Sequence, residues 1–132
     1  MNVLSYIRTA GRPEDDLLRA VAPLAAGGSL EVFADFPSFA ARVRRPKEAS
    51  SVALVYNPNA PDLRALAGLR ELLRDVRVVL VLADQEEETI ALAHRVRPTY
   101  IAYVDDGISG VVSVLKRLTG PRNGAAAGDR RR

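Results

Sequence analysis

Apolar positions along the chain alternate between two spacings, one typical of buried strands and one typical of amphipathic helices. Short runs that are apolar on both faces, as at 51–56 and 76–83, predict strands covered by helices on either side. Between these runs, apolar residues recur every three or four positions, which predicts helices with one buried face. The expected strands are 2–7, 29–34, 51–56, 76–83 and 99–104, and the expected helices are 13–27, 36–45, 62–75, 85–96 and 106–118.

Five strand–helix units in succession predict an α/β domain with a doubly wound, five-stranded parallel sheet and helices on both of its faces. Proline and acidic residues mark the start of the first helix, where Pro13 is followed by Glu14. Pro23 is expected to kink or shorten this helix, because proline removes a backbone donor and clashes with the preceding turn. The sequence predicts one domain over residues 1–119.

Composition narrows the classes of function. The 132 residues contain no cysteine, so a disulfide framework, a thiolate nucleophile and a zinc-finger cluster are all excluded. The apolar run at the start of the chain is too short for a signal peptide, and no segment approaches the length of a spanning helix. We therefore expect a cytoplasmic protein that does not contact membranes.

The net charge of +3 comes from the end of the chain. Residues 120–132 hold four of the 19 basic and one of the 16 acidic residues, which leaves fifteen of each sign in the body. The Gly/Ala/Arg composition of this tail predicts disorder or a linker stub. Because the body is neutral, we do not expect the domain to bind nucleic acid.

Ligands of a doubly wound sheet collect at the carboxyl ends of its strands. Several polar residues fall there, and the carboxylates among them are interpreted as helix caps rather than as metal ligands, with Asp84 capping the fourth helix and Asp106 the fifth. Asn57, which precedes Pro58, is interpreted first as a turn residue and alternatively as a contact for a ligand or partner. The remaining strand-end positions are Thr9, Ala10, Asp35, Ala83, Val104 and Asp105.

The order of elements resembles a known family. The third strand is followed by a polar residue, Asn57, with Pro61 four positions later; "ADQEEE" follows the fourth strand, and the fifth strand is aromatic. Over residues 2–118 the chain resembles the receiver domain of two-component response regulators, which implies a flavodoxin-like fold and a role in signal transduction. The resemblance further implies an acidic pair that holds magnesium, an aspartate phosphoacceptor, a hydroxyl residue and a lysine, after the first, third, fourth and fifth strands respectively.

None of these family residues is present at the matching positions. The acceptor position holds the neutral amide of Asn57, a far weaker nucleophile than a carboxylate, and no lysine occurs between Lys47 and Lys116. We therefore expect a degenerate pocket without a metal, a cofactor or enzymatic activity. Its matching positions are Ala10 and Gly11 (or Arg8 and Thr9) for the acidic pair, Asn57 for the acceptor, Leu82 or Ala83 for the hydroxyl, and Tyr103 or Val104 for the lysine.

The resemblance implies a non-phosphorylatable pseudo-receiver that acts through protein–protein interaction, with a protein partner, an output domain or a second copy in a homodimer. By analogy with the family, the interaction face would include His94, Arg95, Tyr103, Lys116 and Arg117. The alternative is a small-ligand-binding or enzymatic flavodoxin-like domain that uses the strand ends. In that case Asn57, Asp84 and Asp105 would be the polar contacts, but no pairing of a nucleophile with a base is evident.

Overall fold

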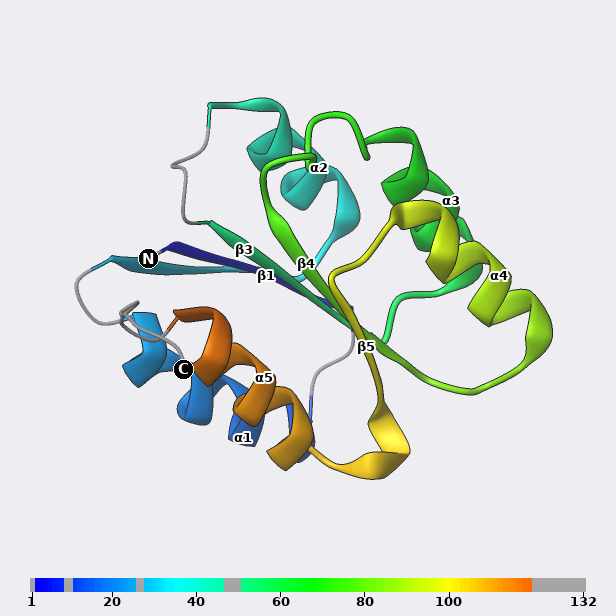
Figure 1. Cartoon of the computed structure of the whole chain (residues 1–132). Coiled ribbons are helices and arrows are strands. Elements are labelled where there is room, and N and C mark those ends of the chain that lie inside the picture. The colour runs from blue at the N-terminus through cyan, green and yellow to red at the C-terminus, as the bar shows by residue number, and fades with distance from the viewer. Residues whose placement is uncertain (1, 9–10, 26–27, 47–50, 120–132) are drawn as a thin grey trace, which may run out of the picture.

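The computed structural model describes residues 2–8, 11–25, 28–46 and 51–119. Their strands form one five-stranded parallel sheet in the order β2-β1-β3-β4-β5 (Figure 1). The sheet confirms the doubly wound, flavodoxin-like architecture expected from the sequence. The strands are β1 (Asn2–Ile7), β2 (Ser29–Phe33), β3 (Val52–Tyr56), β4 (Arg77–Leu82) and β5 (Tyr100–Tyr103).

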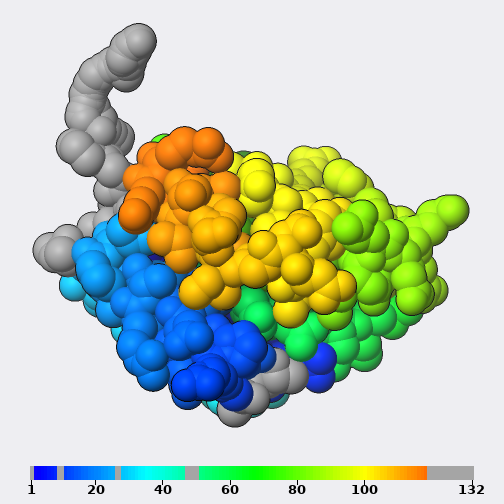
Figure 2. All heavy atoms as spheres, turned by 90° about the horizontal axis from the view of Figure 1, so that it is seen from below, coloured from blue at the N-terminus to red at the C-terminus, as the bar shows by residue number. Residues whose placement is uncertain are grey.

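Helices cover both faces of the sheet. Helices α1 and α5 lie on one face, where Figure 2 shows them adjoining, and α2, α3 and α4 lie on the other (Figure 1). Two short 3-10 helices, η1 (Ala22–Ala25) and η2 (Val104–Asp106), follow α1 and β5. The α-helices are α1 (Arg12–Val21), α2 (Phe36–Arg44), α3 (Ala60–Gly68), α4 (Glu87–Val96) and α5 (Ser109–Thr119).

The core has two halves because the side chains of each central strand alternate between the faces. On β3, Ala53 and Val55 point into the half beneath α2, α3 and α4, whereas Val52 and Leu54 point into the half beneath α1 and α5. Every residue of β3 is buried, which explains why this strand is apolar at consecutive positions. The two apolar layers fix the sheet and thereby the positions of its strand ends.

The third helix is shorter than predicted. A helix was expected over 62–75, but α3 begins at Ala60 and ends at Gly68. Beyond it the chain continues in turns, with amide-to-carbonyl hydrogen bonds from Leu72 to Leu69 and from Leu73 to Arg70. These turns still bury Leu69 and Leu73, so the apolar spacing typical of a helix is kept although α-helical hydrogen bonding has ended.

Two other helix boundaries differ from the expected ones by more than two residues. Helix α1 ends at Val21 and the chain continues as η1, in agreement with the shortening predicted from Pro23. Helix α5 begins at Ser109 rather than at 106, because η2 and Gly107, whose φ is 80°, intervene. The prediction that Asp106 caps this helix was therefore wrong. The predicted tail at 120–132 lies outside the described residues.

Candidate functional site

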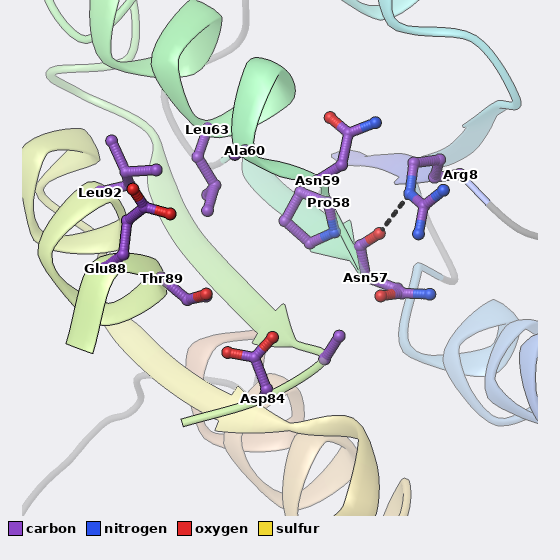
Figure 3. Close-up of a pocket in the computed structure, with 11 residues that line it drawn as sticks. Arg8, Asn57, Pro58, Asn59, Ala60, Leu63, Asp84, Glu88, Thr89 and Leu92 are labelled. Atoms are coloured by element: carbon purple, nitrogen blue, oxygen red, sulfur yellow. Dashed lines mark hydrogen bonds between the residues drawn. The ribbon is translucent and has the colours of Figure 1, made fainter. Parts of the chain in front are cut away.

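A hollow of about 290 Å³ opens at the carboxyl ends of the strands (Figure 3). It lies between the segments that follow β1, β3 and β4 and the first turns of α3 and α4. We call it the strand-end hollow. Its lining residues are Arg8, Asn57, Pro58, Asn59, Ala60, Leu63, Ala83, Asp84, Glu88, Thr89 and Leu92.

Asn57 turns the chain at the end of β3. Its φ of 55° lies in the left-handed region, which asparagine adopts more readily than most residues. Its backbone amide donates a 2.7 Å hydrogen bond to the carbonyl of Val81, which extends the β3–β4 ladder by one position. This geometry agrees with the predicted turn-forming role. It also places the amide side chain at the hollow (Figure 3).

Arg8 holds this turn from the neighbouring strand. Its Nε donates a 2.8 Å hydrogen bond to the backbone carbonyl oxygen of Asn57 (Figure 3). The two residues are 49 positions apart in sequence. They meet because β1 pairs with β3, and Ile7 lies opposite Tyr56 in the register. A positively charged guanidinium group is therefore held beside the position that matches the family's phosphoacceptor.

The start of α3 is held by a second contact from β1. Asn59 and Asp62 form a capping box, in which the amide of Asp62 donates to Asn59 Oδ1 (2.9 Å) and the amide of Asn59 donates to Asp62 Oδ2 (3.3 Å). The hydroxyl of Tyr6 also donates to Asp62 Oδ2, at 2.9 Å. Burial, followed by this bond to Asp62, raises the pKa of Tyr6 well above its ordinary range.

The carboxylates near the strand ends mostly serve local structure. Asp35 caps α2 by accepting from the amide of Ser38 at 2.8 Å, and this bond lowers the pKa of Asp35. Asp84, three residues before α4, accepts from the amide of Glu86 at 3.0 Å. It therefore forms the turn that precedes the helix, and the prediction that it caps the helix was wrong, since Glu86 is the N-cap residue. No group of three or more histidine, cysteine or acidic side chains in the described ranges is placed to hold a metal ion.

The strand-end hollow brings together part of the predicted pocket. Asn57 and Ala83 line it, as does Asp84 from the alternative ligand-binding hypothesis. Gly11, Tyr103 and Val104 are not among the lining residues, and Ala10 lies outside the described part of the chain. The role of Arg8 was missed, although its position directly after β1 placed it at this edge.

The residues of the predicted interaction face lie at two ends of the molecule. His94 and Arg95 occupy the last turn of α4, and Lys116 and Arg117 the last turn of α5, where all four are exposed. Tyr103 is half-buried at the carboxyl end of β5, beside the opposite edge of the sheet. Helices α4 and α5 also cover different faces of the sheet (Figure 1). The five residues therefore do not form one compact patch.

Comparison with known proteins supports the fold. Neither a protein-family model nor a curated protein matches the chain. Its structure is similar to the crystal structure of a protein from Burkholderia pseudomallei K96243 that is provisionally named pilus assembly-related, with a TM-score of 0.62 and 16% identity. The match covers 90% of this chain and 89% of the other. At this identity the likeness shows the fold alone, which is compatible with a receiver-like domain.

No helix within the described ranges is both long and apolar enough to cross a membrane.

Proposed function

We propose that this domain is a cytoplasmic pseudo-receiver, which transmits a signal by binding another protein and is independent of aspartyl phosphorylation. The observation that carries the proposal is the pairing of Arg8 with the backbone of Asn57 at the end of β3. This pairing puts a neutral amide at the acceptor position and a fixed cation next to it. An amide is a far weaker nucleophile than a carboxylate, and a cation at the end of β1 repels magnesium where the family's acidic pair would bind it.

The chemistry of acyl-phosphate formation makes the argument specific. A carboxylate oxygen must attack phosphorus while a divalent cation and a lysine neutralise the developing charge. Magnesium prefers oxygen ligands, usually anionic ones, and Arg8 would repel it from the end of β1. Because the guanidinium already binds the carbonyl of Asn57, the turn is held by the chain itself. We infer that the pocket is kept in one state instead of being switched by phosphorylation.

Binding to another protein is the way in which a pseudo-receiver without phosphorylation would transmit a signal. The similar protein from Burkholderia pseudomallei is named for a relation to pilus assembly. We take from that name only the class of partner, another protein. Non-enzymatic action is part of the same proposal.

A second candidate function is binding of a small ligand in the strand-end hollow. The observation in its favour is the placement of opposite charges around one cavity, with Arg8 on one side and Asp84 and Glu88 on the other (Figure 3). Such an arrangement suits a ligand that carries both an anionic and a cationic group. Asp105, the third contact of the earlier hypothesis, is not in the lining.

The test is an amide NMR titration of the full chain, first with magnesium and then with magnesium plus beryllofluoride as a phosphoryl mimic. The proposal expects unchanged resonances for Asn57, Asp84 and Val104 at both steps. A saturable shift of these three at modest magnesium would contradict it and would favour the second candidate. Sodium chloride at the same ionic strength serves as the control, because carboxylates bind sodium only weakly.

A further inference from the structure

Charge is distributed unevenly over the folded part of the chain. Because all the strands are parallel, the connecting helices run in one direction, so their first turns lie at the carboxyl edge of the sheet and their last turns at the amino edge. Acidic residues occur in the first turns of α1, α3 and α4, and basic residues in the last turns of α1, α2, α4 and α5. Helix dipoles account for this general trend. They do not account for a group of arginines that lies beyond the last residues of α3 and α4.

A second hollow, of about 280 Å³, lies at the amino edge of the sheet. Three arginines line it: Arg70 and Arg74 from the turns after α3, and Arg97 directly after α4. Arg74 has an ion pair with Glu71, but at 3.9 Å and with both side chains 76% exposed this pair is weak. We call the site the basic hollow; its other lining residues are Glu71, Leu73, Val76, Val96 and Thr99.

The backbone of Arg97 is an independent indication that the basic hollow is functional. Its φ of 59° and ψ of 58° put it in the left-handed region, where glycine or asparagine usually ends a helix. A side chain with a Cβ atom is strained there by about 1–2 kcal/mol. Glycine at this position would relieve the strain, so the presence of arginine indicates that its side chain has a function. Here that side chain brings a guanidinium to the hollow.

The chain carries a complementary group at the other end of the same helix. Glu86, Glu87 and Glu88 lie at the start of α4, and all three are exposed. Within the ranges that the structure describes, no ion pair involves them. Figure 1 shows the first turn of α4, in lime, far from its last turn, in yellow. We call these three residues the acidic run.

We propose that two copies of this chain associate head to tail, with the acidic run of one copy seated in the basic hollow of the next. The proposal deepens the proposed function and rests on it in one respect, because it makes a second copy the protein partner. Arginine binds carboxylates through two parallel hydrogen bonds, so three arginines around a cavity match a run of three glutamates. The two surfaces are different, so the contact leaves one of each free and further copies can add.

The first experiment is sedimentation equilibrium of the full chain over a range of protein concentrations. At about 20 mM salt, where screening is weak, the average mass should rise above the 14.3 kDa of one chain as concentration increases. At about 500 mM salt it should return to the mass of one chain, because charges on the surface are then screened within a few ångströms. A single mass of 14.3 kDa at every concentration in low salt would overturn the proposal.

The second experiment separates the two surfaces. Arg70→Gln with Arg97→Gln removes two of the three arginines of the basic hollow and leaves Arg74, which is paired with Glu71. Glu87→Gln with Glu88→Gln removes two of the three carboxylates of the acidic run. Each double variant alone should remain monomeric. An equimolar mixture should form a 1:1 dimer and go no further, because one variant keeps the acidic run and the other keeps the basic hollow.

Matched controls show whether the effect belongs to these two surfaces. Arg44→Gln neutralises an exposed arginine at the end of α2, and Asp15→Asn an exposed acid in the first turn of α1. Both should assemble like the original chain. Assembly of either double variant alone, or a mixture that stays monomeric, would overturn the proposal. A negative result here leaves the magnesium and beryllofluoride titration unaffected, so failure of this inference is distinguishable from failure of the proposed function.

Discussion

The hydroxyl of Tyr6 on β1 donates a 2.9 Å hydrogen bond to Oδ2 of Asp62 in the first turn of α3, across 56 positions of sequence. The same carboxylate oxygen accepts the backbone amide of Asn59. Both Tyr6 and Asp62 are buried, and the ring of Tyr6 packs edge-on against Phe36 at 5.5 Å between centroids. One strand residue therefore fixes the start of the helix that follows the Asn57 turn.

Replacing Tyr6 by phenylalanine is expected to lower the free energy of unfolding by about 1–2 kcal/mol, because a buried carboxylate loses a hydrogen-bond donor. The ring contacts should survive the change. Urea denaturation followed by circular dichroism measures the effect. Tyr56→Phe is the matched control: Tyr56 is equally buried, and no hydrogen bond of its hydroxyl to a carboxylate is found in the described structure, so its cost should be smaller. Equal losses for the two variants would contradict the role given to the Tyr6–Asp62 bond.

Alkaline pH should destabilise the fold through the same residue. Burial and Asp62 raise the pKa of Tyr6 in the folded state, and burial followed by Glu14 raises that of Tyr56. In the unfolded chain both titrate near pH 10. A raised folded pKa means that the stability is fully present below pH 10 and is lost as pH rises through the folded value. The free energy of unfolding should therefore fall above about pH 10, and less steeply in Tyr6→Phe. An unchanged slope in that variant would contradict the assignment.

The strands could be predicted from the sequence because their apolar runs are a local signal. The expected strand at 2–7 coincides with β1, and the other strands agree to within one or two residues at each end. The helix predicted over 62–75 failed for a physical reason. Its leucine spacing continues past Gly68, but the hydrogen bonds there change to those of successive turns. The spacing of apolar residues indicates which side chains are buried, but it does not indicate which backbone hydrogen bonds form.

The candidate site could be predicted only in part. Asn57 was found because its strand and turn are local, and the absence of the family's acidic pair and lysine is visible in the sequence. The bond from Arg8 to Asn57 depends on β1 lying beside β3, and strand order is not written in any local pattern. The basic hollow combines Arg70 with Arg97 from different elements for the same reason.

Asn57→Asp is expected not to restore a receiver. The substitution supplies a carboxylate at the acceptor position and keeps a residue type that tolerates positive φ. Arg8 would then lie beside that carboxylate and compete with magnesium for it. Amide NMR of the variant with magnesium and beryllofluoride should show no saturable shift. The double variant Asn57→Asp with Arg8→Asp tests the cause, since removal of the cation should raise the affinity for magnesium. Magnesium-dependent shifts in the single variant would refute this explanation.

Alanine substitutions at two glycines should change the stability of the fold in opposite directions. Gly68 ends α3, and a Cβ atom placed there would meet nothing within 4 Å. Gly68→Ala should stabilise the fold by about 0.5–1 kcal/mol, because alanine loses less backbone entropy on folding. Gly107 has equal space but a φ of 80°, so Gly107→Ala should destabilise by about 1 kcal/mol. Thermal denaturation of both variants checks the pair, and stabilisation by Gly107→Ala would be the contrary result.

Replacing Arg97 by glycine should increase the stability of the fold and weaken self-association. Arg97→Gly relieves the left-handed strain and should raise the free energy of unfolding by about 0.5–1 kcal/mol, which is the strain less the entropy cost of glycine. Arg97→Ala keeps a Cβ atom in the same backbone conformation, so it should bring no such gain. Both variants remove the guanidinium from the basic hollow and should weaken self-association equally.

Urea denaturation gives the stabilities of the two Arg97 variants, and sedimentation equilibrium at low salt gives their association. If Arg97→Gly were stabilised and still assembled like the original chain, the strain at this position would have no connection with the contact between copies. If both variants lost association but neither gained stability, the basic hollow would still mediate self-association. The left-handed backbone of Arg97 would then not lower the stability of the fold. The strained backbone is linked to the function of the side chain only if Arg97→Gly alone gains stability and both variants lose self-association.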